Sequence, residues 1–204
     1  MKIYLIAATA AILITGSAGK LNAQHGDTKT KQVTLGIKGG LNVYNIHNDN
    51  NVKYDAKTGF HLGLLGHIHL NKQLAIQPEL VYSSQGAKYN ITNNEVKIKL
   101  GYINVPILLQ YMFDNGFRLQ AGPQVGFLVS AKSEMNNSET DIKNNLKKVD
   151  FALGFGAGYI NPKSGFGVDA RYNLGLSDIN ETGSVKSTNR GFQLGVFYLF
   201  HHKS

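Results

Sequence analysis

The 204-residue sequence contains no cysteine, and only 17% of its residues are charged. Without cysteine the chain can form neither a disulfide framework nor a thiolate metal site, and it has no cysteine nucleophile. Beyond the amino end there is no apolar stretch long enough for a transmembrane helix. A hydrophobic content of 42% is nevertheless too high for a disordered chain, and the length fits one domain or two small ones.

The marked apolar run of the sequence lies at the amino end, in residues 3–14 (IYLIAATAAILI). It follows Lys2 and gives way to small and polar residues before Ala23, an order that is typical of a secretory signal peptide cleaved after Ala23. The alternative is a membrane-spanning helix, which needs roughly 20 apolar residues. We therefore assign residues 1–23 to a signal peptide and residues 24–32 to a periplasmic N-terminal tail.

From Val33 onward, large apolar residues alternate with small or polar ones, and a period of two residues is typical of β-strands. The pattern is clearest near the carboxyl end, where Phe192 and Leu194 face one way while Gln193 and Gly195 face the other. Eight strands are therefore expected. They lie within residues 33–45, 60–70, 74–85, 96–111, 117–129, 151–159, 166–176 and 191–200.

The connections between these segments alternate in length. Long ones are expected at 46–57, 87–94, 131–147 and 178–189, and short ones at 71–73, 114–116 and 161–165. Such alternation fits an up-and-down antiparallel arrangement, and in bacterial outer-membrane barrels the short turns face the periplasm. Near Gly101 the apolar set changes from even to odd positions, which predicts a β-bulge.

The direction of the apolar face separates a membrane barrel from a soluble, lipocalin-like one. The interior of an eight-stranded barrel is only just wide enough to be filled by side chains, so it cannot hold the large apolar residues of every strand. These residues must point outward into lipid. We thus predict an all-β, eight-stranded antiparallel up-and-down transmembrane β-barrel over residues 33–200, in the outer membrane, with both termini periplasmic and residues 201–204 as a short C-terminal tail.

The opposite face of the strands then forms a polar lumen. Buried charges must be paired, and the lumen side carries three charges of each sign. Our hypothesis is a salt-bridged plug that leaves no continuous water path. The expected lumen network comprises Lys38, His61, His67, His69, Glu79, Arg118, Asp150, Asp169 and Arg171.

Four strings of the sequence are similar to the PorT-like family of outer-membrane β-barrel domains. They are residues 102–111 (YINVPILLQY), 119–132 (LQAGPQVGFLVSAK), 170–179 (ARYNLGLSDI) and 190–200 (RGFQLGVFYLF). The similarity runs in order from about Val33 to Phe200. It implies an outer-membrane barrel from a family whose members mostly lack an assigned activity and whose founding member is associated with type IX secretion.

Catalytic and metal chemistry is weakly represented. His61, His67 and His69 share one face, so a metal site can be imagined, but hydrogen bonds to Glu79 or Gln77 on the next strand explain them better. Ser83, His61 and Glu79 would have to converge for hydrolysis, on a side that lipid does not reach. We therefore expect no enzyme, no metal and no cofactor.

Opposite charges alternate in the long connections, which argues against a basic stripe for nucleic acid. We expect contacts with outer-membrane lipid, with the outer-membrane assembly machinery and with an envelope or secretion protein. The predicted role is structural, interaction-based or secretion-associated, and the alternatives are a small-solute channel and a lipid-modifying outer-membrane enzyme.

Overall fold

The computed structural model describes residues 33–50, 53–91, 94–182 and 185–200. The predicted signal peptide (1–23), the N-terminal tail (24–32) and the C-terminal tail (201–204) lie outside these residues. In the described part of the chain, no helix is long and apolar enough to cross a membrane.

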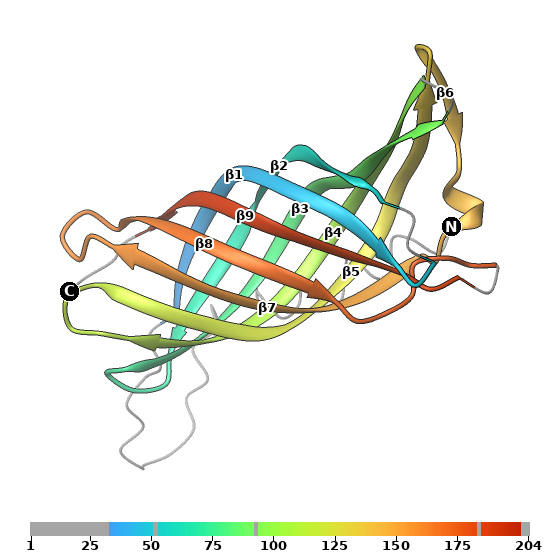
Figure 1. Ribbon diagram of the computed structural model, residues 1–204. Coiled ribbons are helices and arrows are strands. Elements are labelled where there is room, and N and C mark those ends of the chain that lie inside the picture. Colours follow the sequence, from blue (N-terminus) through green and yellow to red (C-terminus); the bar gives the residue numbers. More distant parts are fainter. Residues whose placement is uncertain (1–32, 51–52, 92–93, 183–184, 201–204) are drawn as a thin grey trace, which may run out of the picture. The chain divides into compact units, whose positions relative to one another are not determined.

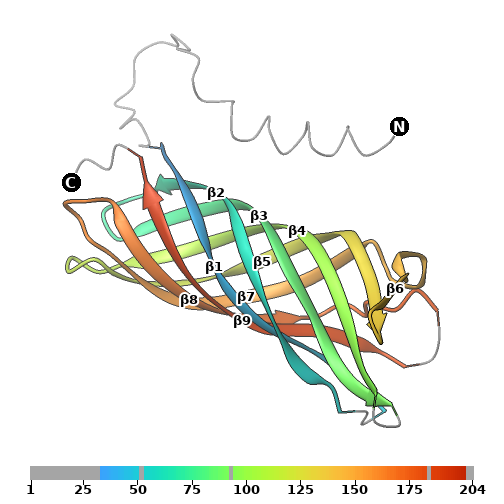
Figure 2. The same cartoon turned by 90° about the horizontal axis from the view of Figure 1, so that it is seen from above.

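Eight antiparallel strands form a closed ring (Figures 1 and 2). They are β1 (Val33–Asn48), β2 (Asp55–His69), β3 (Leu74–Ile91), β4 (Asn94–Met112), β5 (Phe117–Met135), β7 (Val149–Ile160), β8 (Phe166–Gly175) and β9 (Ser187–Leu199). Each strand pairs with the next, and pairing of β1 with β9 closes the ring. The predicted eight-stranded up-and-down topology is thus confirmed.

The long-connection end departs from the prediction. The expected loop at 87–94 is nearly all strand, because β3 runs to Ile91 and β4 begins at Asn94. In the expected loop at 131–147, β5 continues to Met135 and a short strand, β6 (Ser138–Asp141), folds back on it before the 3-10 helix η1 (Lys143–Asn145). Strand β6 carries no apolar residue, so the period of two residues could not reveal it.

The predicted irregularity near Gly101 is present as a shift in the pairing of β4 with β5 between Gly101 and Tyr102. The extra residue is Val129 of β5, since Leu128 pairs with Tyr102 and Ser130 with Gly101. In β4 the even positions point inward on both sides of the shift, where Leu100 and Tyr102 are both buried. The apolar set changes parity because the inward positions are apolar near the long connections, whereas deeper in the bore the large apolar residues point outward.

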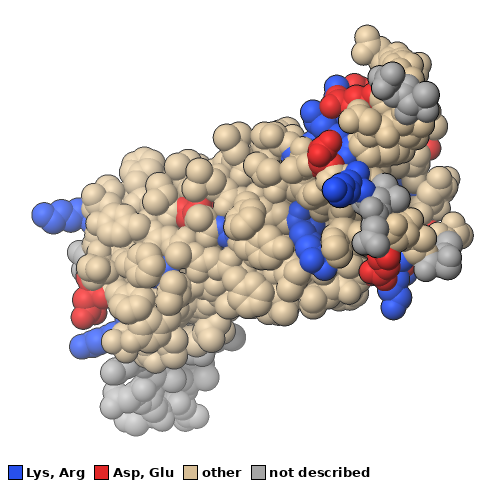
Figure 3. Space-filling view, viewed as in Figure 1, with Lys and Arg blue, Asp and Glu red and all other residues tan. Residues whose placement is uncertain are grey.

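The outer wall of the barrel is apolar. The side chains of Leu41, Leu62 and Leu194 are 61%, 64% and 65% exposed. The polar residue next to each of them in the chain is buried, namely Asn42, His61 and Gln193. Charged side chains gather toward the two ends of the molecule and leave an almost uncharged band between them in the view of Figure 3. The predicted orientation of the two faces is confirmed, because only a hydrocarbon surround suits such a wall.

Aromatic rings mark the rims of this wall. Toward the short turns, Phe166 stacks on Tyr198 with ring centroids 4.5 Å apart, and Tyr198 contacts Phe200 at 5.5 Å. Toward the long connections, Tyr172 and Phe192 lie 4.7 Å apart. Girdles of aromatic residues are typical of both interfaces of a membrane barrel, and the tyrosines add a polar hydroxyl to an otherwise apolar ring.

Candidate functional site

Four buried charges meet in the middle of the barrel. Glu79 of β3 accepts hydrogen bonds from both terminal nitrogens of Arg171 on β8, at 2.8 and 2.9 Å. Lys38 of β1 lies 2.9 Å from Asp169 Oδ2 and 3.4 Å from Glu79. Two bases therefore balance two acids, as buried charges require. We call Lys38, Glu79, Asp169 and Arg171 the charge cluster.

The pair Arg171–Glu79 crosses the bore. The ring order from β3 through β2, β1 and β9 to β8 places the two residues on strands four steps apart in a ring of eight, and so on opposite walls. The bidentate geometry is the strongest form of an arginine–carboxylate contact. The two walls are consequently tied together across the centre of the lumen.

A layer of glutamine amides adjoins the charge cluster. Gln110 donates to both Gln77 and Gln120 at 3.0 Å, and Gln77 in turn donates to Glu79 at 2.7 Å. Arg118 joins this layer through Gln110 Oε1 at 3.4 Å and lies 5.3 Å from the centre of the Phe197 ring. The layer links β3, β4 and β5 at the level of the cluster.

The predicted network divides into separate groups. The structure brings Lys38, Glu79, Asp169 and Arg171 together, but Asp150 instead accepts a 2.5 Å hydrogen bond from Ser177 and forms no ion pair with any residue that the structure describes. Arg118 likewise forms no ion pair within the described ranges. All six predicted lumen charges are buried, three of each sign. Alternation along a strand assigns a face but not a depth along the bore, so the expectation that all six are paired in one network was wrong.

The histidines occupy β2 at two depths. His61 Nδ1 lies 2.7 Å from Asn42 Oδ1 on β1, so its partner is neither Glu79 nor Gln77 as expected. His67 and His69 stand edge to face, with ring centroids 4.6 Å apart. Among the described residues, no group of three His, Asp or Glu side chains is arranged to hold a metal ion.

The supposed hydrolytic group is held by an amide. Asn42 Nδ2 donates to Ser83 Oγ at 2.9 Å while Asn42 Oδ1 contacts His61, so the amide stands between the hydroxyl and the imidazole. Ser83 also receives a hydrogen bond from Gln85 at 3.0 Å. Ser83 and His61 are both buried in the lumen.

Apolar clusters lie in the bore on both sides of the polar layer. Toward the short turns, Leu65 and Ile160 pack with Phe197 and Leu199. Toward the long connections, a larger cluster forms from Ile46, Ala87, Leu100, Tyr102, Leu128, Ala131 and Ile179, with Tyr54, Ile98, Ile142 and Leu146 packed against it. The sequence predicts a lumen of mainly small and polar residues, with Phe197 and Leu199 on the same face as Gln193, and both side chains are indeed buried in the bore.

The ends of β4 and β5 project together with β6 at one end of the barrel (Figure 1). We call residues 94–99 of β4, 132–135 of β5 and strand β6 the strand extension. Lys99 contacts Glu134 and lies 2.8 Å from Glu139, which is also 2.6 Å from Lys132. Hydrogen bonds from Lys132 and Lys99 lower the pKa of Glu139 from 4.5 to about 2.

Solved membrane barrels share this fold. Neisserial surface protein A matches with a TM-score of 0.58 and 13% identity, over 83% of this chain and all of that one. Ail, the attachment invasion locus protein of Yersinia pestis, matches with a TM-score of 0.53 and 18% identity, over 83% of this chain and 99% of that one. At these identities the likeness shows the fold alone.

Sequence comparison identifies the family. Comparison with curated proteins finds no match. The sequence model described as "Outer membrane protein beta-barrel domain" matches residues 22–181, which is more than half of the chain. The match covers the strands that carry all four members of the charge cluster. The chain therefore belongs to the family of outer-membrane β-barrel domain proteins.

Proposed function

We propose that the protein is a non-conducting outer-membrane barrel whose work is structural or interaction-based and takes place at its ends. The observation that carries this proposal is the bidentate Arg171–Glu79 contact between opposite walls. An open channel needs a continuous file of water. Here the middle of the bore is occupied by charges that bind one another.

The apolar clusters add two further barriers. The cluster of Leu65, Ile160, Phe197 and Leu199 offers water few polar partners, and a buried water needs 2–4 of them. The larger cluster at the other end has the same character. A small solute would have to pass both clusters and separate the ion pairs between them.

Single-channel recording tests the closed lumen. Purified protein, verified as folded by its gel shift on heating, is added to planar bilayers beside a porin as positive control. We expect no large and stable conductance steps. Such steps, obtained in several preparations, would refute the plug and favour the small-solute channel.

We assign the interaction role to the strand extension. We place it outside the cell and both termini in the periplasm, because the short turns of outer-membrane barrels face the periplasm. The extension presents three acids, Glu95, Glu134 and Glu139, in contact with three bases, Lys97, Lys99 and Lys132, a surface suited to a polar partner. The partner class we propose is an envelope or secretion protein, consistent with the PorT-like strings, and we propose no catalytic role.

Co-purification tests the interaction role. A tagged full-length chain is extracted from its native membrane in mild detergent, together with a variant in which Ser138–Asp141 is replaced by a short glycine-serine linker. A specific envelope protein should accompany the first and be lost with the second, while both show the same heat shift. Equal recovery with the two chains would refute the extension as the binding surface.

A further inference from the structure

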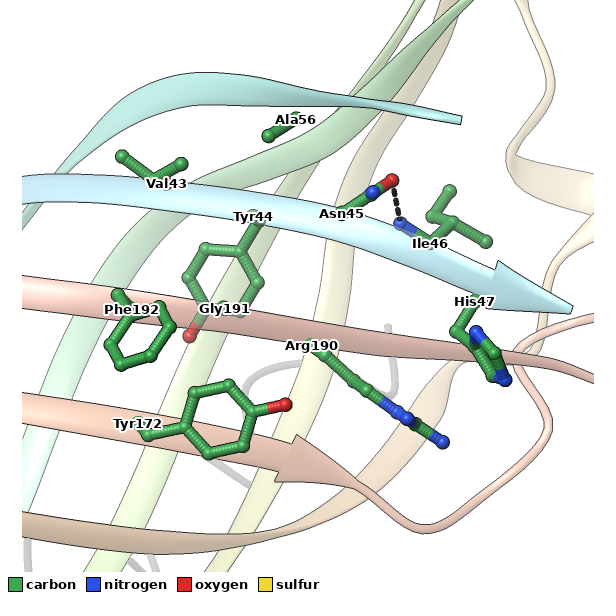
Figure 4. A pocket seen from close by; sticks show the side chains of 10 residues that line it. All are labelled: Val43, Tyr44, Asn45, Ile46, His47, Ala56, Tyr172, Arg190, Gly191 and Phe192. Atoms are coloured by element: carbon green, nitrogen blue, oxygen red, sulfur yellow. Dashed lines mark hydrogen bonds between the residues drawn. The ribbon is translucent and has the colours of Figure 1, made fainter. Parts of the chain in front are cut away.

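A pocket of about 290 Å³ lies on the outer wall of the barrel, toward the long connections (Figure 4). It follows β1, β8 and β9 where these strands run side by side. Its outward side chains are Val43, Asn45, His47, Tyr172, Arg190 and Phe192. The pocket therefore faces the surroundings of the barrel and not its lumen.

Strand register grades this pocket from apolar to polar. The row nearest the middle of the barrel joins Tyr172, Phe192 and Val43 as direct cross-strand partners. The next row pairs Arg190 with Asn45, and one further step toward the rim brings His47. The pocket lining thus changes from aromatic rings to the cation of Arg190 from one row to the next. This change parallels the one from acyl chains to headgroups at a membrane surface.

Arg190 is a cation without a counter-charge. Its side chain is half-buried, its Nε has no hydrogen-bond partner, and it forms no ion pair with a residue in the described ranges. No carboxylate lines the pocket. Asn45 is already engaged, donating to Tyr54 O at 2.8 Å and accepting from Ile46 N at 2.7 Å. The pocket thus holds one positive charge without a counter-charge, next to the apolar side chains of Tyr172, Phe192 and Val43.

We propose that this pocket binds the anionic phosphate of a membrane lipid, in the leaflet that surrounds the long-connection end. Arg190 supplies the fork of donors that suits a phosphate, and His47 adds a second nitrogen group at the rim. Tyr172, Phe192 and Val43 contact the first carbons of an acyl chain. The volume lies just below the range of small-molecule pockets, so it accepts a headgroup and part of one chain.

A lipid is the occupant that the position selects. The wall on which the pocket opens is the apolar one that family membership places in the outer membrane. A soluble anion would gain nothing from the ring pair Tyr172–Phe192, whereas a lipid uses both parts of the site. The leaflet rests on the orientation given under the proposed function, but binding of a lipid phosphate does not.

Native mass spectrometry of the full-length protein released from nanodiscs tests this site. The discs contain phosphatidylcholine with a minor fraction of lipid A as the phosphate probe. We expect lipid A to be retained by the unmodified protein and bound roughly tenfold more weakly by Arg190→Gln, since a hydrogen bond to a charged group is lost. Arg190→Lys should keep part of the binding. Lys163→Gln, which removes the same charge at the opposite rim, should bind as the unmodified protein does.

Three outcomes would overturn the proposal. They are equal retention of lipid A by the unmodified protein and Arg190→Gln, equal loss with Lys163→Gln, and displacement of the bound lipid by inorganic phosphate at a matching concentration. The heat shift on gels verifies that each variant is folded. Lipid retention is measured without any conductance recording or protein partner. The lipid site can therefore be confirmed or refuted whether or not the proposed function holds.

Discussion

Replacing Glu79 with glutamine should destabilise the barrel more than any other conservative change to one side chain of the charge cluster. The substitution keeps the size of the side chain and removes its charge. Lys38 and Arg171 would then share Asp169 alone. An amide nitrogen of the new glutamine would also compete for the space beside the guanidinium.

The magnitude follows from the contacts of Glu79. At an effective dielectric constant of about 20, its attraction to Arg171 at 2.8 Å is about 6 kcal/mol, and its attraction to Lys38 at 3.4 Å is about 5 kcal/mol. Desolvation of the ions, at several kcal/mol each, offsets much of this gain. When one partner of a buried pair loses its charge, the other ions remain desolvated without the attraction that compensated for it. We therefore expect Glu79→Gln to lower the free energy of unfolding by about 3–5 kcal/mol.

The assay is urea unfolding of the barrel in lipid vesicles, followed by the fraction of heat-shifted protein on gels. Glu95→Gln is the matched control, because Glu95 contacts Lys88 at 3.5 Å with a side chain 46% exposed, and we expect no measurable change. The double variant Glu79→Gln with Arg171→Gln should recover most of the loss, since Lys38 and Asp169 remain paired at 2.9 Å. Equal midpoints for Glu79→Gln and Glu95→Gln would refute the reasoning.

Three other perturbations probe the wall, the packing and the rim. Leu194→Arg, near the middle of β9, should destabilise the barrel in vesicles by about 2–4 kcal/mol, and Leu176→Arg near the rim by about 0–1 kcal/mol; equal effects would contradict a lipid-facing wall. Gly40→Ala should cost about 1–3 kcal/mol in the same urea assay, because an added Cβ would meet the backbone of β9, whereas Gly39→Ala meets its nearest atom at 3.4 Å and should be tolerated. Glu139 has a lowered pKa, so the stabilisation that its ion pairs give to β6 is present above pH 4.5 and is lost as the pH falls toward 2. Amide-exchange protection of Ser138–Asp141 should fall over that range of pH while the eight-stranded ring stays protected. Unchanged protection of Ser138–Asp141 would count against the ion pairs.

The ring and its two faces could be predicted from the sequence because a barrel wall imposes one simple rule. Lipid on one side and a narrow bore on the other force a period of two residues, as at Phe192, Gln193 and Leu194. The change of apolar parity near Gly101 has another origin than the bulge, because Leu100 and Tyr102 both point inward and the unpaired residue lies on β5. Short turns and long connections then gave the topology.

Depth along the bore could not be predicted in this way. Asp150 and Asp169 both point inward, yet Asp169 meets Lys38 while Asp150 meets Ser177. Which acid reaches which base depends on the register of every strand between them, and Glu79 and Arg171 are separated by many residues and half the ring. Strand β6 and the end of β5 were missed because β6 carries no apolar residue and leaves no apolar period to detect.

The charge cluster has a consequence for how the wall is joined. Lys38 and Glu79 come from the strands that are made first, and Asp169 and Arg171 from the strand before the last. Within each of these halves an acid already stands beside a base, at 3.4 Å in both cases. Each of the two pairs is therefore charge-balanced by residues of its own strands. When β9 pairs with β1, the contacts Arg171–Glu79 and Lys38–Asp169 are added across the centre, and a slip of two residues in that pairing would break both of them, so the charge cluster favours a single alignment of the two strands.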